Sequence, residues 1–148
     1  MGATLFGILL VTLAISAVIA VVIVRNSRAR AQARLEEVPG RVLRSMAATC
    51  LGRESAGPGQ VKGTGTLVLT DAEVAFAQWR PAHLIRIPRP AIAEVDTTRT
   101  HLGKTMNADM LRIRWSASEG DDTVAFFVRD LDPWLSDLGG RRGDDAQP

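Results

Sequence analysis

The sequence predicts an N-terminal transmembrane helix followed by a mainly-β domain, an antiparallel and partly open barrel of six to seven strands with a C-terminal capping helix. Three observations predict this fold class. Residues 2–24 carry no charge and are strongly apolar. Short apolar segments separated by turn residues then follow one another from residue 66 to residue 128, a rhythm typical of all-β domains. Residues 131–140 finally show the pattern of one short amphipathic helix.

The apolar segment is long enough to cross a bilayer. Its 23 consecutive uncharged residues would form a helix of roughly 34 Å, slightly more than the hydrocarbon core. A cleaved signal peptide is the rival interpretation, but it requires basic residues ahead of the apolar segment, and residues 1–4 contain none. We therefore expect residues 1–24 to be a transmembrane helix that contacts the lipid bilayer through residues 3–24.

Positive charge lies only after the apolar segment, apart from the α-amine. The juxtamembrane basic residues are Arg25, Arg28, Arg30 and Arg34. Because flanking arginines favour the cytoplasmic side, the N-terminus is expected outside and the C-terminal domain in the cytoplasm. A composition rich in Ala, Arg and Gly is typical of GC-rich bacterial genomes, so the expected location is the inner (cytoplasmic) membrane, crossed in a single pass.

The next segment, residues 25–44, is predicted to be a basic juxtamembrane stalk. It holds six arginines against two glutamates, whereas residues 45–140 hold ten basic against twelve acidic residues. The basic character of the chain therefore belongs to the stalk, and the body lacks the positive surface of a nucleic-acid-binding domain. Good helix formers continue the anchor helix until Pro39 and Gly40 stop it.

Residues 45–140 are predicted to form the β domain, with residues 141–148 as a disordered tail. The glycine-rich stretch 56–65 reads as a mobile connection or a wide hairpin loop. Strands are expected at residues 66–70, 74–79, 84–87, 95–100, 110–115 and 123–128. A further strand near residues 46–51 is a candidate, and the pattern leaves open whether it belongs to the barrel.

Two of these strands carry the clearest one-sided pattern. In residues 110–115, Leu111, Ile113 and Trp115 alternate with arginines, which predicts one buried face. We expect this strand to pair with residues 95–100. In the last strand, the inner face is expected to hold Val124, Phe126 and Val128.

The terminal helix has a marked start and end. Asp132 is expected to cap its first backbone N–H groups, with Pro133 at the first helical position. Its apolar face comprises Leu131, Trp134, Leu135 and Leu138. Gly139 and Gly140 end the helix through a left-handed conformation. So short a helix must pack on the sheet or close an open end of the barrel.

The order of strands and terminal helix resembles that of pleckstrin-homology-like domains. The resemblance rests on GTGTLVLTDAEVAF at residues 63–76, LIRIPRPAIAEV at residues 84–95 and FFVRDLDPWLSDL at residues 126–138. Together they look like the bacterial pleckstrin-homology and GRAM-like domains, and the chain is similar to short single-pass bacterial membrane proteins that carry one. The resemblance covers roughly residues 45–139 and implies binding or scaffolding without catalysis. It supplies no functional residues.

Patterns that would indicate chemistry are incomplete. Gly103, Lys104 and Thr105 lack the first glycine of a phosphate-binding loop, and the loop at residues 57–65 lacks the third glycine of a dinucleotide site. Cys50 is expected to be a small buried hydrophobe, His83 and His101 to have turn or surface roles, and Glu119, Asp121 and Asp122 to form a solvated hairpin turn. The sequence therefore predicts no catalytic residues, no metal site and no cofactor.

The expected function is that of a membrane-anchored, non-enzymatic binding or scaffold module facing the cytoplasm. The alternative is an accessory subunit or regulator of a larger membrane complex, with the anchor packing on partners through small residues. Candidate contacts to an anionic surface are Arg80, Arg86, Arg99 and Lys104. We expect the partner to be anionic lipid headgroups or another membrane protein, and no nucleic acid.

Overall fold

The computed structural model describes residues 2–143, so most of the predicted disordered tail, residues 144–148, lies outside the described residues. Helix α1 runs without interruption over Gly2–Glu36 and ends just before Pro39 and Gly40, as predicted. Its 35 residues correspond to a length of about 52 Å. Within residues 2–143, α1 is the one helix long and apolar enough to cross a bilayer, and its most apolar window has no buried residue.

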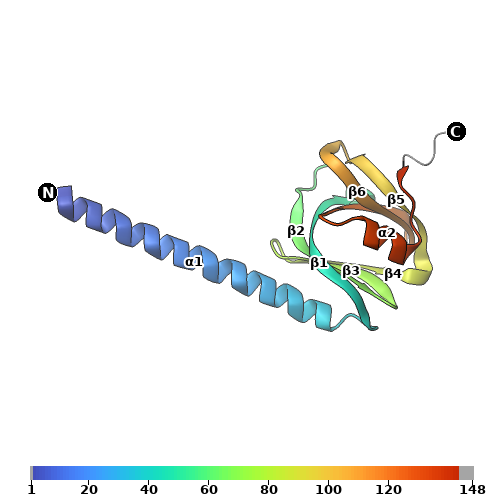
Figure 1. Ribbon diagram of the computed structural model, residues 1–148, viewed down its shortest axis with the longest axis horizontal. Helices are drawn as coiled ribbons and strands as arrows, with labels where there is room; N and C mark the ends of the chain where they lie inside the picture. The colour runs from blue at the N-terminus through green and yellow to red at the C-terminus, as the bar shows by residue number, and fades with distance from the viewer. Residues whose placement is uncertain (1, 144–148) are drawn as a thin grey trace.

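The rest of the described chain is a seven-stranded antiparallel sheet followed by a short helix. The elements are β1 (Val42–Arg53), β2 (Gly63–Thr70), β3 (Glu73–Gln78), β4 (His83–Pro88), β5 (Ile92–His101), β6 (Lys104–Ala117), β7 (Gly120–Val128) and α2 (Asp132–Leu138). The strands follow the order β4-β3-β2-β1-β7-β6-β5. The sheet curves so that β3 and β4 lie on one side of α2 and β5 and β6 on the other (Figure 1). The two edge strands do not pair with each other, so the sheet remains open.

All six expected strands are present, and the candidate near residues 46–51 is part of the sheet. It is β1, which pairs with β2 on one side and β7 on the other. The strand therefore joins the two halves of the fold. Because β1 and β2 are antiparallel neighbours, residues 57–62 form a wide hairpin loop, one of the two predicted alternatives.

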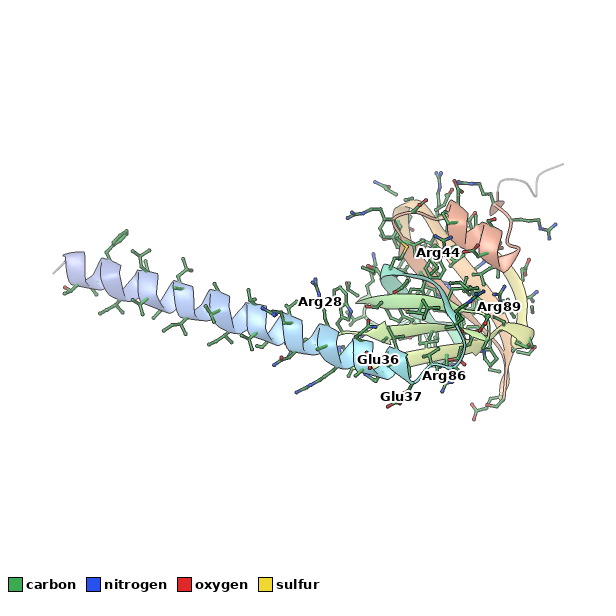
Figure 2. All side chains as sticks on the ribbon, turned by 60° about the horizontal axis from the view of Figure 1, so that its bottom comes forward. Arg28, Glu36, Glu37, Arg44, Arg86 and Arg89 are labelled. Carbon is green, nitrogen blue, oxygen red and sulfur yellow. The ribbon has the colours of Figure 1, made fainter. Side chains whose placement is uncertain are left out.

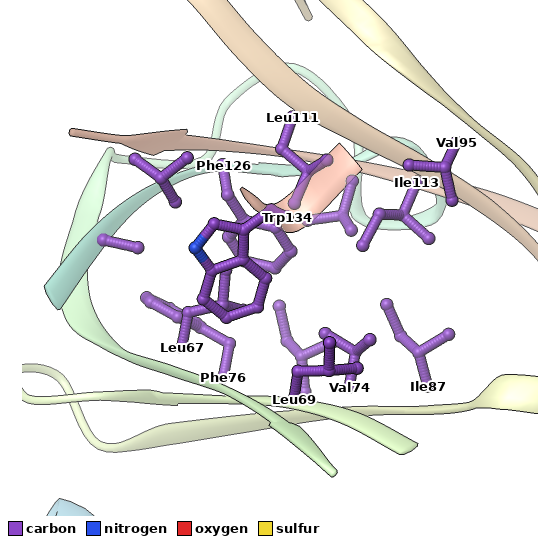
Figure 3. Packing of buried hydrophobic residues seen from close by; sticks show 14 of the residues in the cluster. Leu67, Leu69, Val74, Phe76, Ile87, Val95, Leu111, Ile113, Phe126 and Trp134 are labelled. Atoms are coloured by element: carbon purple, nitrogen blue, oxygen red, sulfur yellow. The ribbon is translucent and has the colours of Figure 1, made fainter. Parts of the chain in front are cut away.

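The main core lies inside the curved sheet, under α2. Buried side chains of β2 to β4 face those of β5 to β7, and Trp134 of α2 lies between them (Figure 3). The predicted inner residues of β6 and β7 are all in this cluster: Leu111, Ile113, Trp115, Val124, Phe126 and Val128. Cys50 is also buried there, and burial raises the pKa of its thiol. The prediction of a buried cysteine in the core is confirmed.

Helix α2 ends as predicted but does not begin as predicted. Gly139 takes the left-handed conformation, with φ 68° and ψ 27°. The N-cap residue is Leu131, which has helical backbone angles, and no side chain caps the helix. The expected Asp132 cap is wrong because this residue is already inside the first turn, where its carboxylate accepts a hydrogen bond from Arg142.

The C-terminal part of α1 is packed against the sheet. Ala31 and Leu35 of α1, together with Val38, are buried in a second cluster with Val68 of β2 and with Ala75 and Ala77 of β3. Their one-turn spacing places Ala31 and Leu35 on one face of the helix. The β domain thus lies beside the end of α1, while the apolar part projects away from it (Figure 1). The segment predicted to be a juxtamembrane stalk therefore forms one side of the packed interface between α1 and the sheet.

Candidate functional site

A cleft opens where α1 meets the turn between β3 and β4; we call it the junction cleft. It has a volume of about 330 Å³. Its lining residues are Ile23, Asn26, Ser27, Arg30 and Arg34 of α1 and Trp79, Arg80, Pro81 and Ala82 of the β3–β4 turn. It is formed by segments about fifty residues apart in the sequence, which the packing of α1 on the sheet brings together.

The helical wall of the cleft follows from residue spacing. Ile23, Ser27, Arg30 and Arg34 occur at intervals of three or four residues, so they form one stripe along α1. Packing of the neighbouring stripe on the sheet fixes the rotation of the helix. The basic stripe is therefore directed toward the β3–β4 turn.

Trp79 fixes the other wall. Its backbone N–H donates to the Thr64 carbonyl at 3.0 Å, and its indole Nε1 donates to Thr66 Oγ1 at 3.1 Å. The Arg28 guanidinium lies over the indole ring at 4.5 Å from its centroid, a cation–π contact between helix and sheet. Arg34 Nη2 adds a long hydrogen bond of 3.5 Å to the Gln78 carbonyl. Arg28 and Arg34 of α1 thus link the helix to the end of β3.

The charge of the cleft is uncompensated. Three of its nine lining residues are arginines and none is acidic. Within residues 2–143, no carboxylate forms an ion pair with Arg30, Arg34 or Arg80. Most arginines of the β domain differ in this respect, because ion pairs hold Arg44, Arg53, Arg86, Arg99, Arg112 and Arg114.

A second cavity of about 260 Å³ continues the junction cleft toward the apolar part of α1. Its lining comprises Val24, Ser27, Lys62, Thr64, Trp79 and Arg80. Lys62 comes from the loop between β1 and β2, so a third segment adds positive charge at the same place. Val24 is the last residue of the uncharged segment. The basic surface therefore begins where the apolar part of α1 ends.

The structure distributes the four residues predicted to contact an anionic surface over separate places. Arg80 lines the junction cleft. Arg86 donates to both carboxylate oxygens of Glu73, at 2.7 and 3.0 Å, which raises the pKa of its guanidinium. Arg86 lies beside Glu37 at the end of α1, away from Arg28 (Figure 2).

The other two lie on the β5–β6 hairpin. Arg99 forms an ion pair with Asp109, with Nε and Oδ1 2.8 Å apart. Lys104 Nζ donates to the Leu51 carbonyl at 3.0 Å and to the Pro58 carbonyl at 3.4 Å, so it fastens the β1–β2 connection to the hairpin. Of the juxtamembrane arginines, Arg30 and Arg34 line the junction cleft and Arg28 stacks on Trp79, whereas Arg25 lies outside it.

The residues that line the cleft together with the arginines of α1 and Arg80 were not predicted from the sequence. Trp79, Asn26 and Ser27 were not expected at a site, nor was Lys62. One signal was available, since the spacing of Ser27, Arg30 and Arg34 already places them on one helix face. The partner of that face could not be read from the sequence.

Two polar residues are less exposed than predicted. Of the turn or surface roles expected for His101, the surface role is wrong: His101 is buried beside the β5–β6 turn, and its Nε2 lies 2.9 Å from the Gly52 carbonyl oxygen. Asp122 is buried, not solvated. Asp122 is covered by Arg53 and by Ser55 of the connection that follows β1, whereas His101 faces Gly52 of β1 itself. His83 is exposed, in keeping with the predicted surface role.

The Asp122 carboxylate accepts four hydrogen bonds. Arg53 Nε donates to Oδ2 at 2.7 Å, the Ser55 hydroxyl donates to the same oxygen at 2.6 Å, and backbone N–H groups of Ser55 and Thr123 donate to Oδ1 at 3.0 and 2.8 Å. Burial raises the pKa of this carboxyl, but the hydrogen bonds outweigh burial and the pKa lies below its usual value. This saturated network is structural, because no acceptor position faces solvent.

Within the described residues, no group of three or more His, Cys, Asp or Glu side chains is placed to hold a metal ion. The junction cleft offers guanidinium, amide and hydroxyl groups, which bind anions. Its lining residues include no nucleophile in hydrogen-bond contact with a base. Its positive charge and hydrogen-bond donors are complementary to a negatively charged group.

Comparison with known proteins informs the fold. No family model matches the chain, and no curated protein matches it. Among solved structures, the chain is similar to the crystal structure of the C-terminal domain of an unknown protein from Leishmania infantum, with a TM-score of 0.51 and 16% sequence identity over 74% of this chain and 88% of that chain. At this identity the similarity supports the fold alone: a seven-stranded, antiparallel, open sheet with a short C-terminal helix.

Proposed function

We propose that the chain is a membrane-anchored, non-enzymatic binding module. Helix α1 holds its β domain against the cytoplasmic surface of the bacterial inner membrane. One observation carries the proposal: a single unbroken helix contains both the apolar segment and the face that packs on the sheet. Anchor and domain are therefore joined without a flexible linker.

The distances along the helix place the domain close to the lipid. Ala31, the first buried residue of the interface, follows Val24 by seven residues, which is about 10 Å along the helix axis. The headgroup layer is roughly 5–8 Å thick on each side of the hydrocarbon core. The β3–β4 turn and the β1–β2 loop, which share cavities with Ile23 and Val24, then lie at the membrane surface.

A pleckstrin-homology-like assignment supports a binding role. Seven antiparallel strands, an open curved sheet and a helix that covers the core agree with that architecture. We propose that the domain is pleckstrin-homology-like. It fits a domain that presents loops to a ligand, as at the junction cleft, and that does not carry out catalysis.

The predicted orientation is tested by cysteine accessibility in bacterial cells. Ser118 and Ser136 are exposed, and each is changed to cysteine in turn. A membrane-impermeant thiol reagent should leave both unlabelled in intact cells and label both after permeabilisation, because positive charge keeps the domain inside. A cysteine at Gly2 should label without permeabilisation. The unmodified chain is the control, since Cys50 is buried. Labelling at Ser118 or Ser136 in intact cells would contradict the orientation.

The rigid connection is tested by Ala31→Glu. Ala31 has no exposed surface, so a longer, charged side chain cannot fit between α1 and the sheet without separating them. In nanodiscs, spin labels at Arg25 and Ser118 should give a narrow distance distribution that broadens at least twofold in this variant. Ala33→Glu, on an exposed position of the same helix, is the control and should leave the distribution narrow. Equal widths for both variants would contradict the packed interface.

A further inference from the structure

We propose that the junction cleft binds the phosphate of an anionic lipid headgroup, from the leaflet in which α1 ends. The proposal rests on the proposed function, because it takes α1 as spanning the bilayer. It names the ligand class of that binding module and the residues that recognise it: Arg30, Arg34 and Arg80.

The cleft is positively charged, because three arginines line it. Guanidinium groups bind phosphate oxygens through paired N–H donors, and such hydrogen bonds are stronger than those between neutral groups. Arg30 and Arg34 are one turn apart on α1, a like-charge spacing that disfavours the helix by itself. Arg80 brings a third positive charge from the β3–β4 turn. A bound anion supplies the countercharge that no described carboxylate gives.

The cleft is lined by polar groups besides the arginines. Asn26 adds an amide, which donates hydrogen bonds and carries no negative charge. The Ser27 hydroxyl lines the same wall but already donates to the Ile23 carbonyl at 2.8 Å. The cleft thus offers donors from α1 and from the β3–β4 turn, next to the apolar side chain of Ile23. Hydrogen-bond donors next to an apolar side chain suit a phosphate that is attached to hydrocarbon better than a free phosphate ion.

The position of the cleft along α1 matches the level of the lipid headgroups. Arg30 follows Val24 by six residues, about 9 Å along the helix. This distance is close to the thickness of the headgroup layer, roughly 5–8 Å. Trp79 lies in the same cleft, and tryptophan is enriched at this level of membrane proteins. The cleft therefore opens where lipid phosphates are concentrated.

The test uses the full chain in mild detergent and native mass spectrometry. Phosphatidylglycerol and phosphatidylcholine with identical acyl chains are added separately, and bound lipid is measured against concentration. The wild-type chain should retain phosphatidylglycerol much more strongly. Changing Arg30, Arg34 and Arg80 together to Gln should weaken phosphatidylglycerol binding about 100-fold, from the usual contribution of three basic residues near anionic lipid. Arg80→Gln alone, at an exposed position, should weaken it about fivefold.

The matched control removes three arginines elsewhere. Arg41, Arg129 and Arg141 are exposed, and changing them together to Gln should alter binding by less than about twofold, since exposed charges beyond a Debye length are screened. An equal loss in both triple variants would show general charge attraction and overturn the cleft assignment. Equal binding of the two lipids by the wild-type chain would also overturn it.

A soluble phosphate compound is excluded in a separate arm. Glycerol phosphate added to the lipid-bound chain should not displace phosphatidylglycerol at millimolar concentration. Displacement by glycerol phosphate at the concentration of the lipid would overturn the lipid assignment in favour of a soluble ligand. The proposed function has its own readout, because cysteine accessibility reports the orientation of the domain whether or not the cleft binds lipid.

Discussion

Replacing Trp134 by alanine is expected to lower the free energy of unfolding by about 3–5 kcal/mol, the usual cost of removing a large aromatic side chain from a core. Trp134 has no exposed surface and lies between the two halves of the curved sheet (Figure 3). Phe76 and Phe126, in the same cluster, are 5.1 Å apart by ring centroids.

The substitution also removes a polar contact. Trp134 Nε1 lies 2.9 Å from Met46 Sδ, and this contact joins α2 to β1. Loss of the ring therefore releases the helix from the strand that connects the two halves of the sheet. Trp134→Phe retains most of the apolar surface and should cost about half as much.

The measurement is urea unfolding of the full chain in detergent, followed by the far-ultraviolet circular dichroism of the sheet, which does not depend on the tryptophan that is removed. Leu138→Ala is the matched control, because Leu138 is only partly buried on the same helix. It should cost less than about 1.5 kcal/mol. A Trp134→Ala loss no larger than that of Leu138→Ala would show that α2 does not close the core.

The second large effect is expected at Asp122, where Asp122→Asn should lower the free energy of unfolding by about 3 kcal/mol. The amide has nearly the shape of the carboxylate, so the variant tests charge and not volume. It turns one acceptor into a donor that faces the donors of Arg53 and Ser55. The Arg53 guanidinium, which also lies over the Trp115 ring at 5.4 Å, loses its countercharge.

Asp121→Asn is the matched control for this substitution. Asp121 is the preceding residue, but it is exposed and accepts one hydrogen bond, 3.1 Å from Ser116. Its replacement should change stability by less than about 0.5 kcal/mol. Equal effects at the two positions, measured by urea unfolding, would mean that burial of Asp122 does not matter.

The same carboxyl makes stability depend on pH in a defined direction. Its pKa in the folded chain is below the ordinary value of 3.8, so its contribution is complete above about pH 5 and is lost as the pH falls from there through the folded pKa. The difference in stability between wild type and Asp122→Asn should therefore shrink as the pH falls from 5 to 3. A difference that stays constant over this range would contradict the lowered pKa.

The sequence alone predicted most elements of the fold, for local reasons. An uncharged segment of 23 residues can satisfy its backbone only as a helix when it is in lipid, and α1 is continuous as expected. Alternating Leu111, Ile113 and Trp115 can bury one face only as a strand. Gly139 adopts the left-handed conformation that ends a helix, because it has no Cβ. Each of these patterns is contained in a few neighbouring residues.

The tertiary structure alone decided which distant residues meet. Arg30 and Arg80 lie in one cleft because α1 packs on β2 and β3. The face of α1 that makes this contact consists of only two apolar side chains, Ala31 and Leu35, within a basic segment. Likewise Asp122 is buried because Arg53 and Ser55, almost seventy residues earlier, cover it. Charge patterns in the sequence give the number of arginines but not their partners. Those partners depend on contacts between segments far apart in the chain. Such contacts pair Arg53 with Asp122 and leave Arg30, Arg34 and Arg80 without an ion pair to a described carboxylate.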